Sequence, residues 1–181
     1  MEWTRSPGAH NVPVVTGAAF RPGTSTDLLR SVIEPGRQSF ELADDAYGVR
    51  RTRHVLVHHG PAELMAVHDS VPAGTLRSLW HFDPALAVVS REAGVVVLGD
   101  GSGFRVTLPQ FPGEGQGIRP GMVSPGYLRT AEVVTVVSPA APAVVTVIVP
   151  GTASVTASPL TVHTEGGPVT LPPPYDRPAQ R

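Results

Sequence analysis

Short Val-rich runs alternate with turn-forming clusters from Val12 to about His163. Within these runs, apolar and polar positions often alternate, which is typical of half-buried strands rather than of amphipathic helices. The expected strands are residues 12–18, 39–43, 47–59, 63–71, 76–83, 86–90, 94–100, 103–108, 128–138, 144–149 and 160–164. This pattern predicts an all-β fold, an antiparallel two-sheet β-sandwich over residues 1–164.

Turn-forming residues between the expected strands refine this prediction. Gly, Pro and Asp are concentrated at residues 58–63 and 99–103, which predicts two hairpins. Residues 24–33 are expected to form at most a short helix, capped by Thr26 or Asp27 and ended by Pro35.

Two further segments are rich in Gly and Pro. Residues 109–127 are expected to form a long surface loop. Residues 165–181 contain several Pro residues and little apolar material, so they are expected to form an extended or disordered tail outside the sandwich.

Charge and composition exclude several classes of protein. All 14 basic residues are Arg, and with 15 acidic residues and 7 neutral His the formal net charge is −1, so no basic field attracts nucleic acid. The sequence contains no run of about 18 apolar residues, so it predicts no membrane-spanning helix. Residues 1–10 do not have the pattern of a signal peptide. The sequence has no GxSxG, P-loop or GxGxxG motif, which removes support for hydrolase, NTPase and Rossmann classes.

His10 and Asn11 immediately precede the first expected strand. Because the chain has no Cys, any metal site must use His or carboxylate ligands. Zinc needs three or four ligands, and no HxH or HxxxH partner lies near His10. Two interpretations therefore stay open: His10 is a zinc ligand, or it is hydrogen-bonded to a loop carbonyl.

Two arginines share one face of the strand expected at residues 47–59. Arg51 and Arg53 are two positions apart, while Arg50, His54 and His58 share the opposite face. Such a pair of arginines could bind the carboxylate or sulfate of an acidic glycan. The alternative is a polar strand face that meets only water.

An acidic residue lies on an otherwise apolar strand face in the next expected strand. Asp69 shares its face with Met65 and Val67, so it must find a partner, either His81 or an Arg of the preceding strand. A structural pair and a catalytic pair are both compatible with this pattern.

Four segments together resemble the heparinase II/III-like polysaccharide lyases. SPGAHNVPVVTG at residues 6–17 is similar to their s-x-x-HNT-v-v-v-dG segment, with Val12 and Thr16 where the family has Thr and an acid. YGVRRTRHVLVHHGPAELMAVHDSV at 47–71 and SLWHFDP at 78–84 resemble the next strands, and residues 122–150 resemble the closing ones. The resemblance covers about 150 residues in order.

The resemblance implies a chain that is N-terminally incomplete. In the family, an α/α toroid precedes the β-sandwich, and the enzyme cleaves uronic-acid polysaccharides by β-elimination. The catalytic Tyr and His and the Asn that neutralises the uronate belong to the toroid, so no catalytic residue is expected in this chain. The family binds zinc through three elements, of which only His10 matches here, so we expect this chain alone to hold no cofactor.

The resemblance also implies partners and a location. The expected partners are an acidic polysaccharide and the missing toroid of the same protein, and the expected location is secreted or periplasmic. The residues expected to contact substrate are Asn11, Arg51, Arg53, Asp69 and His81. The alternative function is a stand-alone carbohydrate-binding or structural β-sandwich module at the cell surface.

Overall fold

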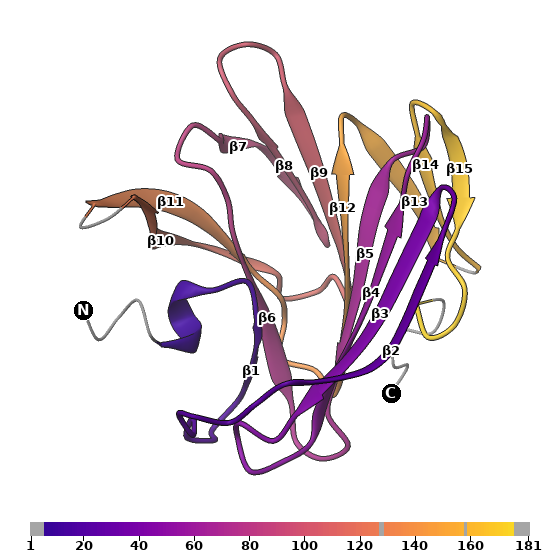
Figure 1. The fold of residues 1–181 in the computed structure, drawn as a ribbon. Coiled ribbons are helices and arrows are strands. Elements are labelled where there is room, and N and C mark those ends of the chain that lie inside the picture. The colour runs from indigo at the N-terminus through magenta and orange to yellow at the C-terminus, as the bar shows by residue number, and fades with distance from the viewer. Residues whose placement is uncertain (1–5, 127–128, 158, 176–181) are drawn as a thin grey trace.

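A computed structural model describes residues 6–126, 129–157 and 159–175 as three layers of antiparallel strands (Figure 1). The strands are β1 (Pro13–Val15), β2 (Asp27–Glu34), β3 (Arg37–Asp44), β4 (Arg51–His58), β5 (Leu64–Ser70), β6 (Leu76–His81), β7 (Ala87–Glu92), β8 (Val95–Gly99), β9 (Arg105–Phe111), β10 (Gly117–Gly126), β11 (Arg129–Val137), β12 (Ala143–Pro150), β13 (Ala153–Ala157), β14 (Leu160–Thr164) and β15 (Gly167–Thr170). Within the described residues, the only helix is the 3₁₀ turn η2 (Pro7–Ala9). No helix there is long and apolar enough to cross a membrane.

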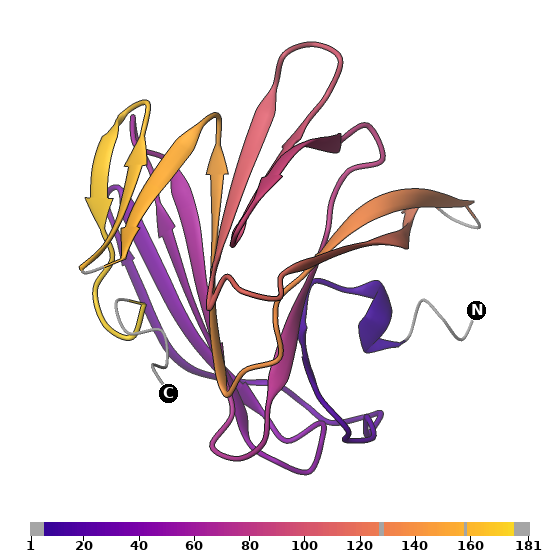
Figure 2. The same cartoon turned by 180° about the vertical axis from the view of Figure 1, so that it is seen from behind.

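The central layer is a sheet of eight strands, which we call the large sheet. Its order is β2-β3-β4-β5-β12-β9-β8-β7, and the hairpins predicted at residues 58–63 and 99–103 join β4 to β5 and β8 to β9. A four-stranded sheet of order β1-β6-β11-β10 faces it, as Figure 2 shows from behind. We call the side of the large sheet toward this second sheet its inner face. The predicted antiparallel sandwich is therefore confirmed.

Apolar side chains fill the space between these two sheets. Trp80 and Val136 of the four-stranded sheet pack with Val67, Leu98 and Leu108 of the large sheet. Successive residues of a strand point to opposite faces, so the Val-rich alternation of the sequence places these side chains together. Burial of such side chains contributes about 1.5–3 kcal/mol each relative to exposure.

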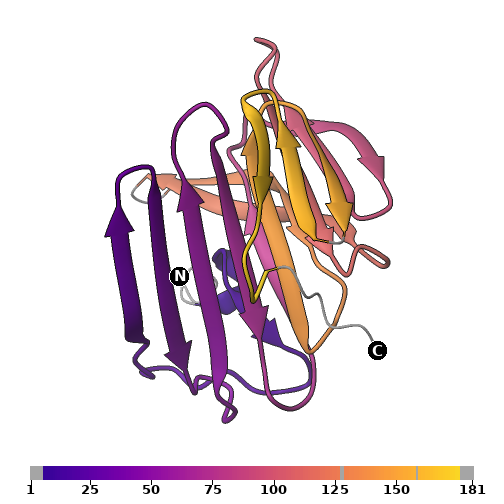
Figure 3. The same cartoon turned by 90° about the vertical axis from the view of Figure 1, so that its right-hand side faces the viewer.

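A third, three-stranded sheet of order β13-β14-β15 covers part of the opposite, outer face of the large sheet (Figure 3). Leu160 and Val162 of this sheet pack against Ala66 and Val147 of the large sheet. The chain after β15 adds Leu171 and Tyr175 to the same cluster, and both are buried. The third sheet leaves the outer face of β2 and β3 open, as their exposed and half-buried positions show.

The expectation of a short helix at residues 24–33 is wrong. Asp27–Glu34 is strand β2, at the edge of the large sheet, and it pairs with β3. Pro35 and Gly36 form the turn of this hairpin, and Gly36 has φ +78°, a conformation that Gly adopts without a steric penalty. Pro35 therefore directs a chain reversal between strands and does not end a helix.

The expected loop and tail also contain strands. In the segment 109–127, Gly117–Gly126 forms β10 at the edge of the four-stranded sheet. Pro120 lacks a backbone N–H, and an edge strand tolerates this because one of its sides has no neighbouring strand. Tyr127 lies outside the described residues. In the segment 165–181, Gly167–Thr170 forms β15 and pairs with β14. Residues 167–170 are therefore extended, as one of the two expected alternatives, but they form a strand of the third sheet and not a tail outside the fold, and residues 176–181 lie outside the described part of the chain.

Candidate functional site

The inner face of the large sheet carries an ion pair between neighbouring strands, in which Asp69 is buried and Arg53 is partly buried. Arg53 of β4 lies opposite Asp69 of β5 and donates two hydrogen bonds to its carboxylate, at 2.6 and 2.9 Å. The Ser78 hydroxyl donates a third hydrogen bond to Asp69 at 2.6 Å. The Arg53 guanidinium also lies over the Trp80 ring, with its central carbon 5.5 Å from the ring centroid, which is within the range of a cation–π contact. The predicted partner of Asp69, an Arg of the preceding strand, is confirmed.

Arg51 has a similar environment near the end of β4. Its Nε donates to the Asp44 carboxylate at 2.7 Å, and Nη1 donates to the Pro13 carbonyl of β1. The guanidinium lies 5.0 Å from the centre of the Tyr47 ring. Arg51 and Arg53 are thus both hydrogen-bonded to residues of this chain. This arrangement fits neither a pair of free arginines that bind a glycan nor a strand face that meets only water.

Asn11 connects this ion pair to His81. The Asn11 carbonyl accepts a hydrogen bond from Arg53 at 2.6 Å. Its side-chain oxygen accepts a hydrogen bond from the backbone N–H of His81 at 2.6 Å and lies 3.3 Å from the ring nitrogen Nδ1 of His81. Its amide nitrogen donates to the His81 carbonyl at 3.3 Å. Asp69, Arg53, Asn11 and His81 therefore form one connected set, which we call the Asn11 network.

His81 points away from the large sheet, because it follows Trp80, whose ring packs between the sheets. Burial lowers the pKa of His81, and the positive charge of Arg119 and the neighbouring His10 lower it further. A hydrogen bond with the Gly8 backbone opposes this shift. The His81 ring is consequently biased toward the neutral form, which can donate one hydrogen bond and accept another.

A cavity of about 380 Å³ lies beside the His81 ring. It is lined by Gly8, His81, Arg119, Pro120, Gly121, Met122, Glu132 and Thr135. Arg119, Thr135 and His81 lie in one row across β10, β11 and β6, so their side chains share a face of the sheet. This cavity combines the Arg119 guanidinium and the His81 imidazole on one face of the sheet, and Glu132 also lines it.

Sequence patterns identified most of this site but not Arg119. Arg119 falls in the segment expected to be a loop, and its role depends on the pairing of β10 with β11. Ile118, Pro120 and Met122 alternate with Arg119 and Gly121 in the sequence, which is a weak signal for an edge strand. His81 lies close enough to His10 for the imidazole of His10 to lower the pKa of His81.

The described residues do not by themselves fit a zinc ion. His10 is exposed and its neighbour His81 could supply a second imidazole, but no group of three His, Asp or Glu residues in the described chain could hold a metal. Zinc sites use three or four protein ligands or three ligands and water. His10 as a metal ligand stays a prediction.

No protein-family model and no curated protein matches this sequence. Solved structures are nevertheless similar in fold. The heparan sulfate lyase HepC from Pedobacter heparinus superposes with a TM-score of 0.74 at 13% identity, over 99% of this chain and 32% of that chain. The heparinase III BT4657 gene product gives a TM-score of 0.71 at 17% identity, over 94% of this chain and 31% of that chain.

The chain has the fold of a heparinase III portion. A further heparinase III structure gives a TM-score of 0.69 at 15% identity, over 94% of this chain and 30% of that chain. This chain therefore spans less than a third of the length of the heparinases that it matches. The predicted resemblance to the β-sandwich portion of heparinase-like lyases is confirmed at the level of the fold.

Proposed function

We propose that this chain is the β-sandwich portion of a heparinase-like polysaccharide lyase. The observation that carries the proposal is the match of nearly the whole chain, 94–99% of it, to about 30% of the heparinase III chains. In this proposal, an α/α toroid supplies the groups that perform the β-elimination, and the chain alone does not cleave glycan. The intact protein then acts on acidic polysaccharide outside the cytoplasm.

In this proposal, the Asn11 network and the cavity beside His81 help to bind and orient the acidic sugar. β-Elimination removes the proton beside a uronate carboxylate and protonates the leaving oxygen, so the carboxylate must be neutralised and the sugar held in place. Arg119 can donate two hydrogen bonds to a carboxylate or sulfate at the cavity. His81 and Glu132 line the same cavity and can exchange hydrogen bonds with sugar hydroxyls.

Arg53 and Asp69 act as positioning residues in this scheme. The Arg53 guanidinium is bound to Asp69 on one side and holds the Asn11 carbonyl on the other. Asn11 in turn holds both the backbone and the ring of His81. The rigid ion pair therefore fixes the orientation of the residues nearest the cavity, and the proposed role of the chain uses no zinc ion.

The test compares glycan cleavage with glycan binding by the purified chain. Cleavage is followed by the ultraviolet absorbance of the unsaturated uronate, on heparin, heparan sulfate, alginate and hyaluronan, and we expect none. Binding of heparan sulfate fragments is followed by NMR, and we expect chemical-shift changes at η2, β6 and β10. Arg119→Gln should weaken this binding about tenfold, because a charge-assisted hydrogen bond is lost.

Arg129→Gln is the matched control, since it removes an exposed Arg from the neighbouring strand β11. Robust cleavage by the chain alone that disappears in His81→Ala would overturn the proposal. Shift changes confined to other surfaces would instead favour the alternative, a stand-alone carbohydrate-binding or structural module.

A further inference from the structure

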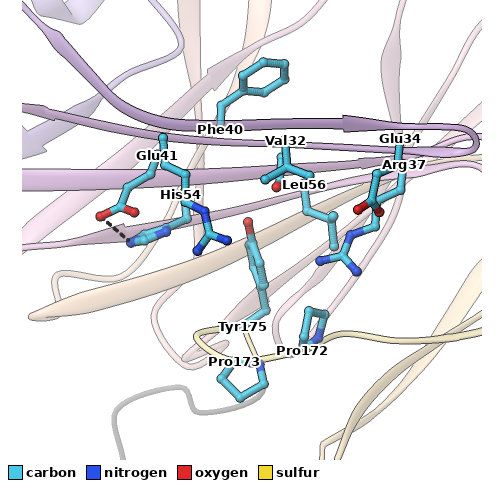
Figure 4. Close-up of a pocket in the computed structure, with 12 residues that line it drawn as sticks. Val32, Glu34, Arg37, Phe40, Glu41, His54, Leu56, Pro172, Pro173 and Tyr175 are labelled. Atoms are coloured by element: carbon cyan, nitrogen blue, oxygen red, sulfur yellow. Dashed lines mark ion pairs between the residues drawn. The ribbon is translucent and has the colours of Figure 1, made fainter.

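A polar cavity lies on the outer face of the large sheet, separated from the Asn11 network by the sheet itself. It has a volume of about 300 Å³ and is bounded by β2, β3 and β4 on one side and by the segment Pro172–Tyr175 on the other (Figure 4). Arg30, Arg37 and His54 line it. We call it the outer pocket.

The two arginines of the outer pocket form no ion pair with any acidic residue in the described part of the chain. Arg50, Arg51 and Arg53 each form an ion pair, but among the described residues no carboxylate oxygen lies within 4.0 Å of the Arg30 or Arg37 guanidinium. Glu41, which also lines the pocket, is 4.0 Å from His54. The pocket therefore holds two guanidinium groups with their hydrogen-bond donors available.

Tyr175 supplies a fixed third donor. Its side chain is only 4% exposed, and its ring packs edge-on against His68 with the centroids 6.4 Å apart. Its hydroxyl points into the pocket between Arg37 and His54 (Figure 4), and no hydrogen bond joins it to another described residue. Burial raises the pKa of Tyr175 strongly, so its hydroxyl stays protonated and able to donate.

The other residues of the pocket limit which anion fits. Glu34 and Glu41 balance the two arginines, so the pocket as a whole disfavours a polyanion. Carboxylates can accept hydrogen bonds from hydroxyl groups, and Leu56 and Pro172 offer an apolar surface. A singly charged ligand that also carries hydroxyl groups and a C–H face matches all of these features, and about 300 Å³ is at the lower end for small-molecule sites.

We propose that the outer pocket binds one acidic saccharide unit through its carboxylate or sulfate. Arg37 and the Tyr175 hydroxyl donate hydrogen bonds to the oxyanion, and Arg30 contributes the second positive charge. Glu34 and Glu41 accept hydrogen bonds from the sugar hydroxyls. The pocket is independent of the proposed lyase function, because it uses the opposite face of the large sheet.

The experiment titrates the full chain with glucuronate, with glucose and with inorganic sulfate, and follows backbone amides by NMR. We expect saturable shift changes with glucuronate in β2, β3 and residues 171–175, and none with glucose. Tyr175→Phe, which removes only the hydroxyl, should weaken binding about tenfold, and Arg37→Gln should weaken it by at least as much.

Two controls separate this site from the Asn11 network. Arg119→Gln and Arg129→Gln should leave the shifts in the outer pocket unchanged. Saturable binding that is unaffected by both Tyr175→Phe and Arg37→Gln would overturn the proposal, as would the absence of saturable binding. Binding of sulfate without binding of glucuronate would also overturn it, since the pocket would then select a bare anion and not a saccharide.

Discussion

Arginines on the two faces of the large sheet have opposite surroundings, although some lie on neighbouring strands. On the inner face, Arg53 is bound to Asp69, to the Asn11 carbonyl and over Trp80. On the outer face, Arg30 and Arg37 line an open pocket without an acidic partner in the described chain. The inner arginines stabilise the fold through internal hydrogen bonds, whereas the N–H groups of the outer arginines are available to a ligand.

This contrast follows from what covers each face. The four-stranded sheet covers the inner face, so a charge there must be paired when it loses water. The third sheet and the chain after it pack on the outer face of β4, β5 and β12, whereas β2 and the first part of β3 stay open. Unpaired charges are tolerated on β2 and β3 because water still reaches them.

The largest expected effect is the loss of the inner ion pair. Asp69→Ala leaves the Arg53 guanidinium without its two carboxylate hydrogen bonds and leaves Ser78 without its acceptor. We expect the free energy of unfolding in urea to fall by about 3 kcal/mol, because the mostly buried Arg53 guanidinium loses its carboxylate partner. Asp27→Ala, which removes the exposed ion pair with Arg50, is the control and should cost less than about 1 kcal/mol. Equal losses in the two variants would contradict the contrast between the faces.

The inner ion pair was partly predictable from the sequence. An acid on an apolar strand face requires a partner, and adjacent antiparallel strands place Arg53 within reach of Asp69. The approach of Asn11 to His81 was not predictable, because it joins residues 70 positions apart through the pairing of β1 with β6. Local patterns fix which residues share a face, but they do not fix which strands become neighbours.

The outer pocket was even less predictable from local sequence patterns than the inner ion pair. Strand β2 exposes nearly all of its residues, so it lacks the alternation of buried and exposed positions that identifies a strand. Tyr175 lies in a Pro-rich segment whose composition is typical of disorder, yet the third sheet and Leu171 hold it against the large sheet. Both elements depend on tertiary contacts that composition does not reveal.

A histidine on the outer face should make stability depend on pH. Burial lowers the pKa of His68, and the neighbouring His54 lowers it further, while Asp69 opposes the shift. Below about 6.5 the unfolded chain therefore binds more protons at this position than the folded chain does, so stability falls as the pH drops. We expect His68→Leu to flatten the decrease in unfolding free energy between about pH 7 and about pH 5.5.

The control for this pH dependence is His59→Gln, which changes an exposed histidine. His59→Gln should retain the decrease seen in the original chain. His81 contributes in the same direction, because its pKa is also lowered, so a residual decrease is expected in His68→Leu. An unchanged slope in His68→Leu would show that the outer-face histidine is not a source of acid sensitivity.

The smallest expected change in stability is that of Arg37→Gln, which tests whether an outer arginine serves ligand binding rather than folding. Arg37→Gln removes a charge that has no ion pair in the described chain, so we expect the free energy of unfolding to change by less than about 0.5 kcal/mol. Arg53→Gln, the same substitution on the inner face, should cost more than about 2 kcal/mol, because the Asp69 side chain is only 1% exposed and loses its cation. Urea denaturation of the two variants measures this difference directly. A large loss of stability in Arg37→Gln would mean that Arg37 holds the segment Pro172–Tyr175 in place, and the arginines of both faces would then serve the fold.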